Sequence, residues 1–337
     1  MAAINGTTNE KAYISEELYQ KLSSVSGKLE KGDVLITGGG SVGNPYIVPN
    51  NEPLYTKDAD LLWIKNQGRF HPYYLYEYFF SPTFRTHLSS ISHVGTIAHY
   101  TITQLSETPI CLPDIEEQVK VGEYFESLDN LITLHQRKYE KLTNVKKSML
   151  EKMFPQNGSS YPEIRFKGFT DPWEQRKFED IAVRSSIISS ESGLPRVEYE
   201  DIISGTGCLN KDIFNKESDK TGIVFHKGDV LYGKLRPYLQ NWLLPLFDGL
   251  AVGDFLILQP QNADSSFLYR LIQSRKFDEV ANQSTGTKMP RADWKLVSKT
   301  AFFIPSTIEE QTVIGTYFEK LDHLITLHQR KFEKSPL

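Results

Sequence analysis

The sequence predicts an α/β (α+β) fold of two similar domains joined by two long helices that form an antiparallel coiled coil. Three observations support this prediction. Residues 115–141 recur as residues 308–334, with 20 of 27 positions identical. The apolar residues of both copies have the spacing of a helix that pairs with another helix. The segments before the two copies share an order of motifs, which indicates that a whole domain is duplicated.

The apolar residues that form one face of each predicted helix, called the stripe, are spaced alternately three and four residues apart. Each copy begins with glutamates, which favour the positive end of the helix dipole. Because the stripe is narrow, each helix needs a partner, and the other copy is the nearest candidate. The stripe residues are Phe125, Leu128, Ile132, His135 and Tyr139 in the first copy, and Phe318, Leu321, Ile325, His328 and Phe332 in the second.

The alternative is that each helix packs only on its own domain. Packing on a domain core would require only the stripe residues to stay the same in both copies. The outward residues of the two copies are identical as well, which favours two equivalent docking surfaces. Recent duplication would explain the same identity, so both explanations stay open. The candidate docking residues are Gln136, Arg137, Lys138, Gln329, Arg330 and Lys331.

The histidines of the stripe, His135 and His328, are interpreted first as packing residues that fix the register of the pair. If the helices run antiparallel, the two imidazoles approach one another, and pairing would weaken at acid pH.

Composition favours an ordinary soluble protein of two domains. The chain has 337 residues, 39% of them hydrophobic, and a formal net charge of −4. A pI near 6.1 is not typical of a nucleic-acid-binding protein on its own. Two cysteines, Cys111 and Cys208, exclude a disulfide scaffold and cannot form a metal site alone. We expect a cytoplasmic protein that does not enter a membrane, because no apolar run approaches about 18 residues.

The first domain is assigned to residues 1–114. Residues 32–37 form a strand-like run before a glycine cluster. Residues 71–88 are expected to be helical with an interruption at Pro82, and residues 107–114 are expected to include a last strand.

The remaining segments follow from the duplication. The first spacer helix is assigned to residues 115–154, the linker to 155–172, the second domain to 173–307 and a shortened second helix to 308–337. The second domain begins about 26 residues before Tyr199, whereas the first begins near the point equivalent to that tyrosine. The first domain is therefore expected to be incomplete at its start.

The two domains share motifs but differ in their loops. The sequence KGDVL occurs at 31–35 and again at 227–231, and a Gly-Thr pair occurs at 95–96 and 286–287. Divergent loops on a kept scaffold are expected if each domain recognises something different, and drift of surface loops is the alternative.

No catalytic or metal site is predicted. The glycine run 38–43 lacks the Lys-Ser/Thr ending of a phosphate-binding loop. Asn44-Pro45-Tyr46 lacks the second proline of the amino-methyltransferase loop Asn-Pro-Pro-Tyr, and no glycine motif for a methyl-donor cofactor accompanies it.

The candidates for DNA contact are polar, basic and aromatic loop residues, because arginine and lysine contact guanine or phosphate and amides can read adenine. Solvated loop residues are the alternative at each position. The candidates are Lys234, Arg236, Tyr238, Gln240, Asn241, Thr285, Thr287, Lys288 and Arg291 in the second domain, and Thr7, Thr8, Ser41, Asn44, His99 and Tyr100 in the first.

Four segments resemble the DNA-specificity (S) subunit of type I restriction-modification enzymes. They are the helix entries LPDIEEQ and IPSTIEEQ, the stripes LDNLITLHQRKYEKL and LDHLITLHQRKFEK, and the domain opening WEQRKFEDI at 173–181. The resemblance covers essentially the whole chain. It implies two target-recognition domains, each reading half of a split DNA sequence, held apart by antiparallel helices.

The resemblance also implies partners. Two modification subunits would dock along the helices and hold S-adenosylmethionine, and restriction subunits would cut double-stranded DNA with ATP and Mg. This chain would be a non-catalytic subunit without a cofactor of its own. The alternative is a truncated S-subunit fragment that binds partners without full bipartite recognition. A third reading, a stand-alone nuclease or methyltransferase, is disfavoured by the missing motifs.

Overall fold

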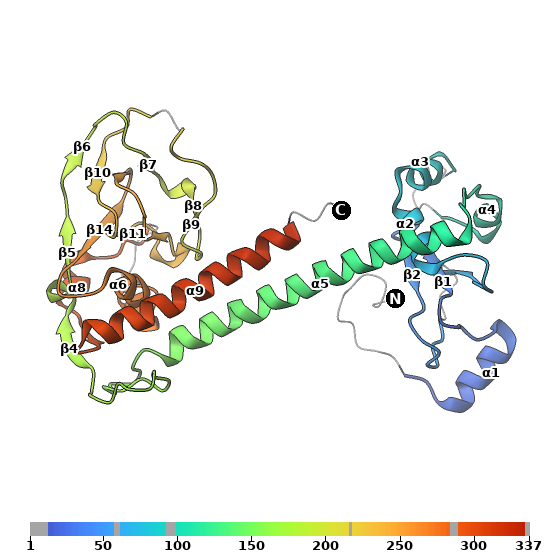
Figure 1. Ribbon diagram of the computed structural model, residues 1–337, viewed down its shortest axis with the longest axis horizontal. Coiled ribbons are helices and arrows are strands. Elements are labelled where there is room, and N and C mark those ends of the chain that lie inside the picture. The colour runs from blue at the N-terminus through green and yellow to red at the C-terminus, as the bar shows by residue number, and fades with distance from the viewer. Residues whose placement is uncertain (1–12, 57–60, 92–98, 216–217, 284–288, 334–337) are drawn as a thin grey trace. The chain divides into compact units, whose positions relative to one another are not determined.

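The computed structural model describes residues 13–56, 61–91, 99–215, 218–283 and 289–333 (Figure 1). Two compact units divide the chain, Met1–Leu134 and His135–Pro336. The division falls inside the long helix α5, Ile115–Lys152, so each unit contains part of this helix.

Unit 1 contains a three-stranded antiparallel sheet in the order β2-β1-β3. Its central strand β1, Val34–Thr37, is fully buried between β2, Pro45–Ile47, and β3, Leu61–Ile64. One face of this sheet joins the aromatic core that includes Phe79 and Phe84.

The helices of unit 1 begin where their local sequence favours a helix start. Helix α2, Pro72–Phe80, has proline in its first turn, where a missing N–H costs nothing. Helix α3, Pro82–Ile91, follows at once, so the predicted interruption at Pro82 is confirmed. Helix α4, Ile102–Glu107, starts with a capping box between Thr101 and Gln104. The remaining helix is α1, Glu16–Ser26.

The strand predicted within residues 107–114 is wrong, because these residues have no regular structure after α4. The equivalent segment of unit 2 is strand β15, Ala301–Ile304, which pairs antiparallel with β4, Glu174–Lys177. No strand of the described part of unit 1 takes the place of β4, so the ladder hydrogen bonds of residues 109–112 cannot form there.

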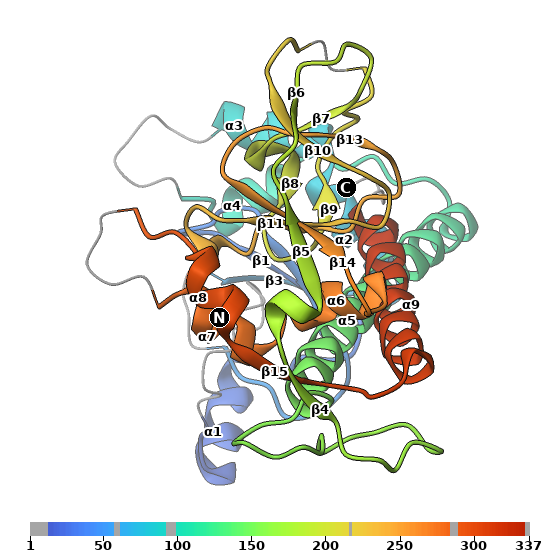
Figure 2. The same cartoon turned by 90° about the vertical axis from the view of Figure 1, so that its left-hand side faces the viewer.

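Unit 2 is built around two four-stranded sheets and smaller strand pairs (Figure 2). The central sheet has the order β12-β11-β14-β5, and all its neighbours are antiparallel. Its strands are β5 (Ala182–Ser185), β11 (Val230–Gly233), β12 (Trp242–Leu243) and β14 (Phe255–Pro260).

The second four-stranded sheet of unit 2 has the order β6-β10-β13-β7, in which only β13 and β7 are parallel. Its strands are β6 (Ile188–Ser189), β7 (Arg196–Val197), β10 (Gly222–Phe225) and β13 (Gly249–Ala251). A short hairpin of β8 (Ile202–Ile203) and β9 (Cys208–Leu209) lies beside these sheets. The described residues of unit 2 also include the 3-10 turns η1 (Phe178–Asp180), η2 (Tyr199–Asp201) and η3 (Pro237–Leu239).

The central sheet of unit 2 is buried on both faces, as the alternation of side chains along β11 requires. Val230 and Tyr232 join the core on the helix side, whereas Leu231 joins the core shared with the second sheet. The helices on the first side are α6 (Ser265–Leu271), α7 (Arg275–Ala281) and α8 (Trp294–Lys299). The expected mixed fold of helices and sheets is confirmed.

The duplicated helices enter the two units in the same way. In unit 1 the Gln118 side chain accepts a hydrogen bond from the backbone N–H of His71, at the start of α2 (3.1 Å). In unit 2 Gln311 accepts one from the backbone N–H of Asp264, at the start of α6 (2.9 Å). Gln118 and Gln311 are equivalent positions of the repeat, so both copies anchor the same kind of helix junction.

Helix α9, Ile308–Glu333, lies beside the second half of α5, and the two pair antiparallel as predicted (Figure 1). His135 lies against His328 near the end of α9, whereas Lys146, further along α5, contacts Asp322, further back along α9. The contact points move forward on one helix and backward on the other, which defines the direction.

Some stripe residues do not lie in the seam. Phe318 and Leu321 are buried in the core of unit 2 together with residues of α6. In unit 1, Phe125 is 38% exposed, and Leu128 and Ile132 are half-buried. The early part of α9 therefore packs on its own domain and on the end of α5, whose residues Leu142, Val145 and Met149 pack against the same cluster.

The helix ends differ slightly from the predicted ranges. Helix α5 stops at Lys152, and Met153 and Phe154 turn into the core of unit 2. Residues 155–172 contain no helix or strand. The last four residues of the range predicted for the second helix, 334–337, lie outside the described part of the chain.

Candidate nucleic-acid interface

The candidate interface of unit 2 is a loop, residues 234–241, that follows β11. Arg236 and Gln240 have left-handed backbones, with φ of 50° and 55°, and flank the turn η3. The N–H of Leu239 donates to the carbonyl of Arg236 (2.9 Å), which closes the turn. Pro237 is buried below it, and Tyr238 projects outward with 56% of its surface exposed.

A second segment, residues 289–292, fixes the base of this loop. The N–H of Arg236 donates to the carbonyl of Pro290 (2.8 Å), and the N–H of Ala292 donates to the carbonyl of Lys234 (2.9 Å). Leu235 and Arg291 form an isolated antiparallel bridge between these bonds. The loop is therefore held in place by strand-like pairing with residues 289–292.

Tyr199 secures the same loop from below. Its hydroxyl accepts a hydrogen bond from the N–H of Leu235 (3.1 Å) and donates one to the carbonyl of Asp254. Burial raises the pKa of Tyr199 to about 12, so the hydroxyl keeps its proton at neutral pH. The ring also packs on Phe255, with centroids 4.5 Å apart.

A third segment, residues 203–206, lies against the far side of the loop. The N–H of Gly205 donates to the carbonyl of Gln240 (3.0 Å), and the Ser204 hydroxyl donates to the carbonyl of Leu239. We call residues 203–206, 234–241 and 289–292 together the loop platform. Three segments distant in sequence thus present a fixed surface with Arg236, Tyr238 and Gln240 on one loop.

The predicted contact residues of unit 2 differ in how far they are exposed on the loop platform. Arg236 is exposed, and Lys234 and Gln240 are half-buried. Arg291 is exposed, but its Nε lies 2.6 Å from Asp254 Oδ2 in an ion pair. Asn241 is only 8% exposed, because it packs beside Gly233 and its carbonyl accepts the N–H of that glycine (2.6 Å). The prediction of Asn241 as a contact residue is therefore corrected.

The predicted residues of unit 1 are placed less favourably. Ser41 and His99 are exposed, and Asn44 is half-buried with its side-chain oxygen 3.4 Å from an Arg85 nitrogen. Tyr100 is only 2% exposed, and its hydroxyl bonds to Thr108 (2.6 Å), so its prediction as a contact residue is corrected.

Five predicted residues lie outside the described residues. They are Thr7, Thr8, Thr285, Thr287 and Lys288.

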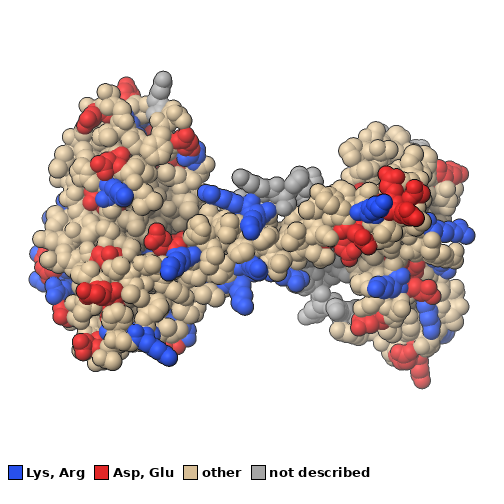
Figure 3. Space-filling model, viewed as in Figure 1, with Lys and Arg blue, Asp and Glu red and all other residues tan. Residues whose placement is uncertain are grey.

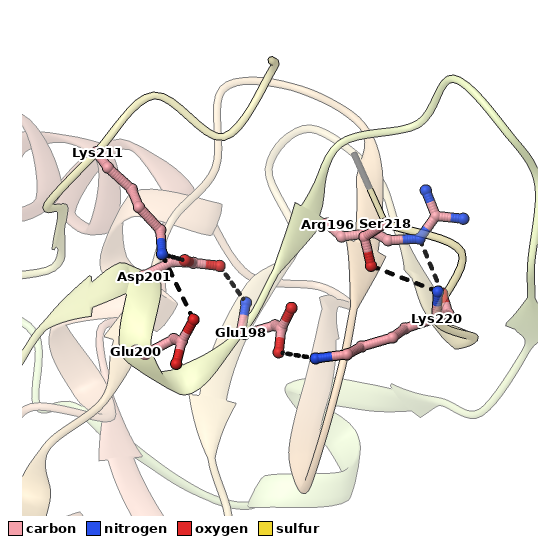
Figure 4. Close-up of polar contacts among 7 residues, drawn as sticks. All are labelled: Arg196, Glu198, Glu200, Asp201, Lys211, Ser218 and Lys220. Atoms are coloured by element: carbon pink, nitrogen blue, oxygen red, sulfur yellow. Dashed lines mark hydrogen bonds and ion pairs between the residues drawn. The ribbon is translucent and has the colours of Figure 1, made fainter. Parts of the chain in front are cut away.

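Several other cations of unit 2 serve the fold rather than a ligand (Figure 4). Lys211 Nζ lies 2.8 Å from the fully buried carboxylate of Asp201, and Lys220 Nζ lies 2.7 Å from Glu198. Arg196 is 4% exposed and donates to the carbonyl of Lys220 (2.8 Å). These pairs leave the platform residues as the better candidates for phosphate or base contact.

The charges of the surface are mixed over unit 2, whereas Lys and Arg gather over α5 and α9 (Figure 3). The predicted docking residues Gln136, Arg137 and Lys138 are exposed on α5. On α9, Arg330 and Lys331 are exposed and Gln329 is half-buried. Both copies of the repeat therefore present cationic side chains to solvent at equivalent positions.

Within the described residues, no group of three or more His, Cys, Asp or Glu side chains is placed to hold a metal ion. None of the described helices combines the length and apolar character needed to cross a bilayer.

Sequence reasoning missed the residues that hold the platform. Tyr199, Pro237 and Pro290 lie far apart in the chain or look like ordinary turn residues, so no local pattern marks them. The only sequence signal was the alternation of charged, aromatic and amide side chains after β11.

Comparisons with known proteins agree on one family. A family profile described as the type I restriction modification DNA specificity domain matches residues 2–144. The chain is 24% identical over 250 residues to the type I restriction enzyme MjaVIII specificity subunit of Methanocaldococcus jannaschii, covering 67% of this chain and 58% of that protein. It is 32% identical over 134 residues to the putative type I restriction enzyme specificity subunit S.HindORF215P of Haemophilus influenzae, covering 38% and 33% respectively. The matches thus span between a third and three fifths of the length of these relatives.

A solved structure shares the fold. The S subunit of a type I restriction-modification system from M. genitalium superposes with a TM-score of 0.60 at 12% identity, covering 91% of this chain and 80% of that one.

Proposed function

We propose that this chain, which belongs to the family of type I restriction-modification DNA specificity subunits, recognises a bipartite DNA sequence, each unit reading one half. The proposal rests on family membership and on the duplicated organisation. The M. jannaschii relative is named as a specificity subunit, and a specificity role for this chain follows from the shared DNA specificity domain.

The observation that carries the bipartite proposal is the antiparallel pairing of the duplicated helices. His135 meets His328, and Tyr139 meets Phe332 with ring centroids 5.6 Å apart. Each of these pairs joins equivalent positions of the two copies, which requires a local pseudo-twofold axis between them. Helices related in this way expose equivalent surfaces, which suit two copies of one partner.

The partner subunits would supply the chemistry. Two modification subunits would dock on the exposed residues 136–138 and 329–331, and restriction subunits would join that assembly. S-adenosylmethionine, ATP and Mg would be bound by these partners, and this chain would act as a non-catalytic subunit. The acidic net charge of −4 fits a division in which partners contribute part of the phosphate contacts.

On the DNA side, the platform of unit 2 offers the best-placed groups. Arg236 would contact guanine or phosphate, Gln240 would read a base edge, and Tyr238 would pack against the sugar or base. Because the platform backbone is fixed by three segments, little ordering cost would be incurred on binding.

A second candidate function is supported by unit 1. Its described residues lack a counterpart of β4, and Tyr100 is buried, so fewer side chains are presented. The chain would then be a partner-binding specificity fragment that does not read a complete bipartite site.

Co-purification with a modification subunit, followed by sequencing of the methylated genome, tests these proposals. One split motif supports bipartite recognition, and a single half-site or no motif supports the second candidate. Methylation by this chain without a partner would contradict both.

A further inference from the structure

Arg291 of the loop platform forms an ion pair with Asp254, the residue before β14. The Nε atom of Arg291 lies 2.6 Å from Oδ2 of Asp254, and the side chains of Arg291 and Asp254 are 51% and 40% exposed, respectively. Ion pairs between side chains this exposed contribute little to folding. The pair therefore adds little to stability, and its position on the loop platform is what distinguishes it.

The charge of Asp254 is opposite to that of the loop platform. The three segments of the platform carry Lys234, Arg236 and Arg291 and contain no aspartate or glutamate. A carboxylate beside such a surface repels the phosphates of DNA, so it lowers the affinity that the cations provide. Any contribution of Asp254 to DNA recognition therefore lies in geometry rather than in charge.

The backbones of both partners are held in place. The carbonyl of Asp254 accepts hydrogen bonds from the N–H of Lys234 (2.7 Å) and from the Tyr199 hydroxyl. Arg291 lies in the isolated antiparallel bridge at the base of the loop, and the next residue, Ala292, is fully buried. The ion pair therefore joins two fixed backbones, and the carboxylate sets the direction of the guanidinium.

The bond to Asp254 uses one edge of the Arg291 guanidinium. It engages Nε, whereas the N–H groups of the two Nη atoms are not part of it. The donors of a guanidinium form a planar and rigid fork, so fixing Nε also fixes the direction of the Nη pair. Such a fork matches the O6 and N7 acceptors that guanine presents in the major groove. The Nη edge of Arg291 therefore suits a bidentate contact with one guanine.

We propose that Arg291 reads a guanine of the target DNA and that Asp254 is the positioning residue that orients it. The inference rests on the proposed function, because it assigns a base to the loop platform of unit 2. A phosphate contact needs only the charge of Arg291, and Asp254 would weaken it. A bidentate base contact needs the orientation of the fork, which Asp254 provides. This difference separates the two roles by experiment.

The test is competition binding of a library of target variants to the chain assembled with its modification subunit. The wild type should prefer guanine by about tenfold or more at one position of the half-site that unit 2 reads, and Arg291→Ala should abolish this preference. Asp254→Asn should reduce the preference at the same position by about threefold or more. Its affinity for non-target DNA should not fall, because a negative charge near the phosphates is removed.

A double-mutant cycle and a conservative variant separate orientation from folding. Asp254→Asn combined with Arg291→Ala should lose no more guanine preference than Arg291→Ala alone, because the two residues act through one contact. Asp254→Glu keeps the carboxylate and should retain more of the preference than Asp254→Asn. The preference is a ratio of affinities measured on one protein, so a smaller folded fraction leaves it unchanged.

The matched control is Glu179→Gln, which removes the carboxylate from an ion pair with Lys299 outside the loop platform (2.8 Å). It should leave the base preferences as they are in the wild type. A guanine preference that survives Asp254→Asn, or a loss of affinity in Arg291→Ala that is equal for all sequences, would overturn the inference and leave the proposed function in place. A wild-type complex without any base preference would overturn both.

Discussion

The imidazoles of His135 and His328 share a hydrogen bond between their Nδ1 atoms, which lie 2.8 Å apart. One ring must donate and the other accept, so this bond requires at least one neutral histidine. The rings come from equivalent positions of the repeat, and their contact lies in the paired part of α5 and α9. The helix pair therefore contains a contact that depends on protonation.

We predict that acid weakens the paired helices through His328. Burial lowers the pKa of His328 below its ordinary value of 6.5, and His135, Lys138 and Lys331 lower it further. Because the pKa of His328 is lower in the folded chain, His328 of the unfolded chain gains its proton first as the pH falls through 6.5. The free energy of unfolding should therefore decrease below this pH.

Thermal unfolding of the wild type and of His328→Phe, between about pH 7.5 and about pH 5.5, measures this effect. The variant should lose less melting temperature on acidification than the wild type. The control His323→Phe changes an exposed histidine of the same helix and should behave like the wild type. Equal losses in all three proteins would contradict the prediction.

We predict that Arg165→Ala strongly destabilises unit 2. The Glu310 side chain is 2% exposed and would be left as a buried carboxylate without its cation. Breaking a buried pair in this way costs about 3 kcal/mol. Chemical denaturation followed by tryptophan fluorescence measures the loss, since Trp173 lies in the same cluster.

The matched control for that experiment is Arg176→Ala. Its ion pair with Glu174 is exposed on both sides, at 42% and 47%, and should contribute at most about 1 kcal/mol. If both variants lower the free energy of unfolding equally, the buried ion pair does not hold residues 155–172 against α9.

The helix pairing could be predicted from the sequence because the repeat is long and its stripe is regular. A spacing of three and four residues defines a helix face without knowledge of the rest of the fold. The contact of His135 with His328 followed from the same pattern. Helix starts such as Pro72 and the break at Pro82 also depend on local chemistry alone.

The surroundings of each copy could not be predicted, because identical residues meet different partners. Glu117 and Glu310 occupy the same position of the repeat, yet only Glu310 has Arg165 above it. The strand expected before α5 fails for the same reason, since β15 depends on β4, more than a hundred residues earlier.

The candidate site was predicted only in part. The run after β11 carries the basic, aromatic and amide side chains on which the DNA-contact prediction is based, and Arg236 and Tyr238 are exposed. Nothing local distinguishes Asn241 from Gln240, although Asn241 is buried beside Gly233 and Gln240 is half-buried on the loop platform. The burial of Asn241 depends on its contact with Gly233 of β11, a neighbour that the local sequence does not reveal.

We predict that Arg236→Ala weakens binding of the assembled complex to its DNA target by about tenfold or more and relaxes the preference at one base position. Arginine to a base edge contributes about 1–3 kcal/mol of discrimination. Competition binding with a library of target variants measures both effects.

Lys227→Ala is the matched control for that measurement, because Lys227 is exposed at the opposite end of β11. It should leave base preference unchanged. Equal effects of the two variants would show that the platform after β11 does not read DNA.

The central claim is that the paired helices set the distance between two DNA half-sites, and a four-residue insertion after Lys141 tests it most directly. Four residues make about one helical turn and lengthen the helix by about 6 Å, which corresponds to about two base pairs of DNA. Methylome sequencing of cells that express the variant with a modification subunit measures the gap. A gap longer by about two base pairs, with both half-sites unchanged, is the predicted result. An unchanged gap would contradict the account.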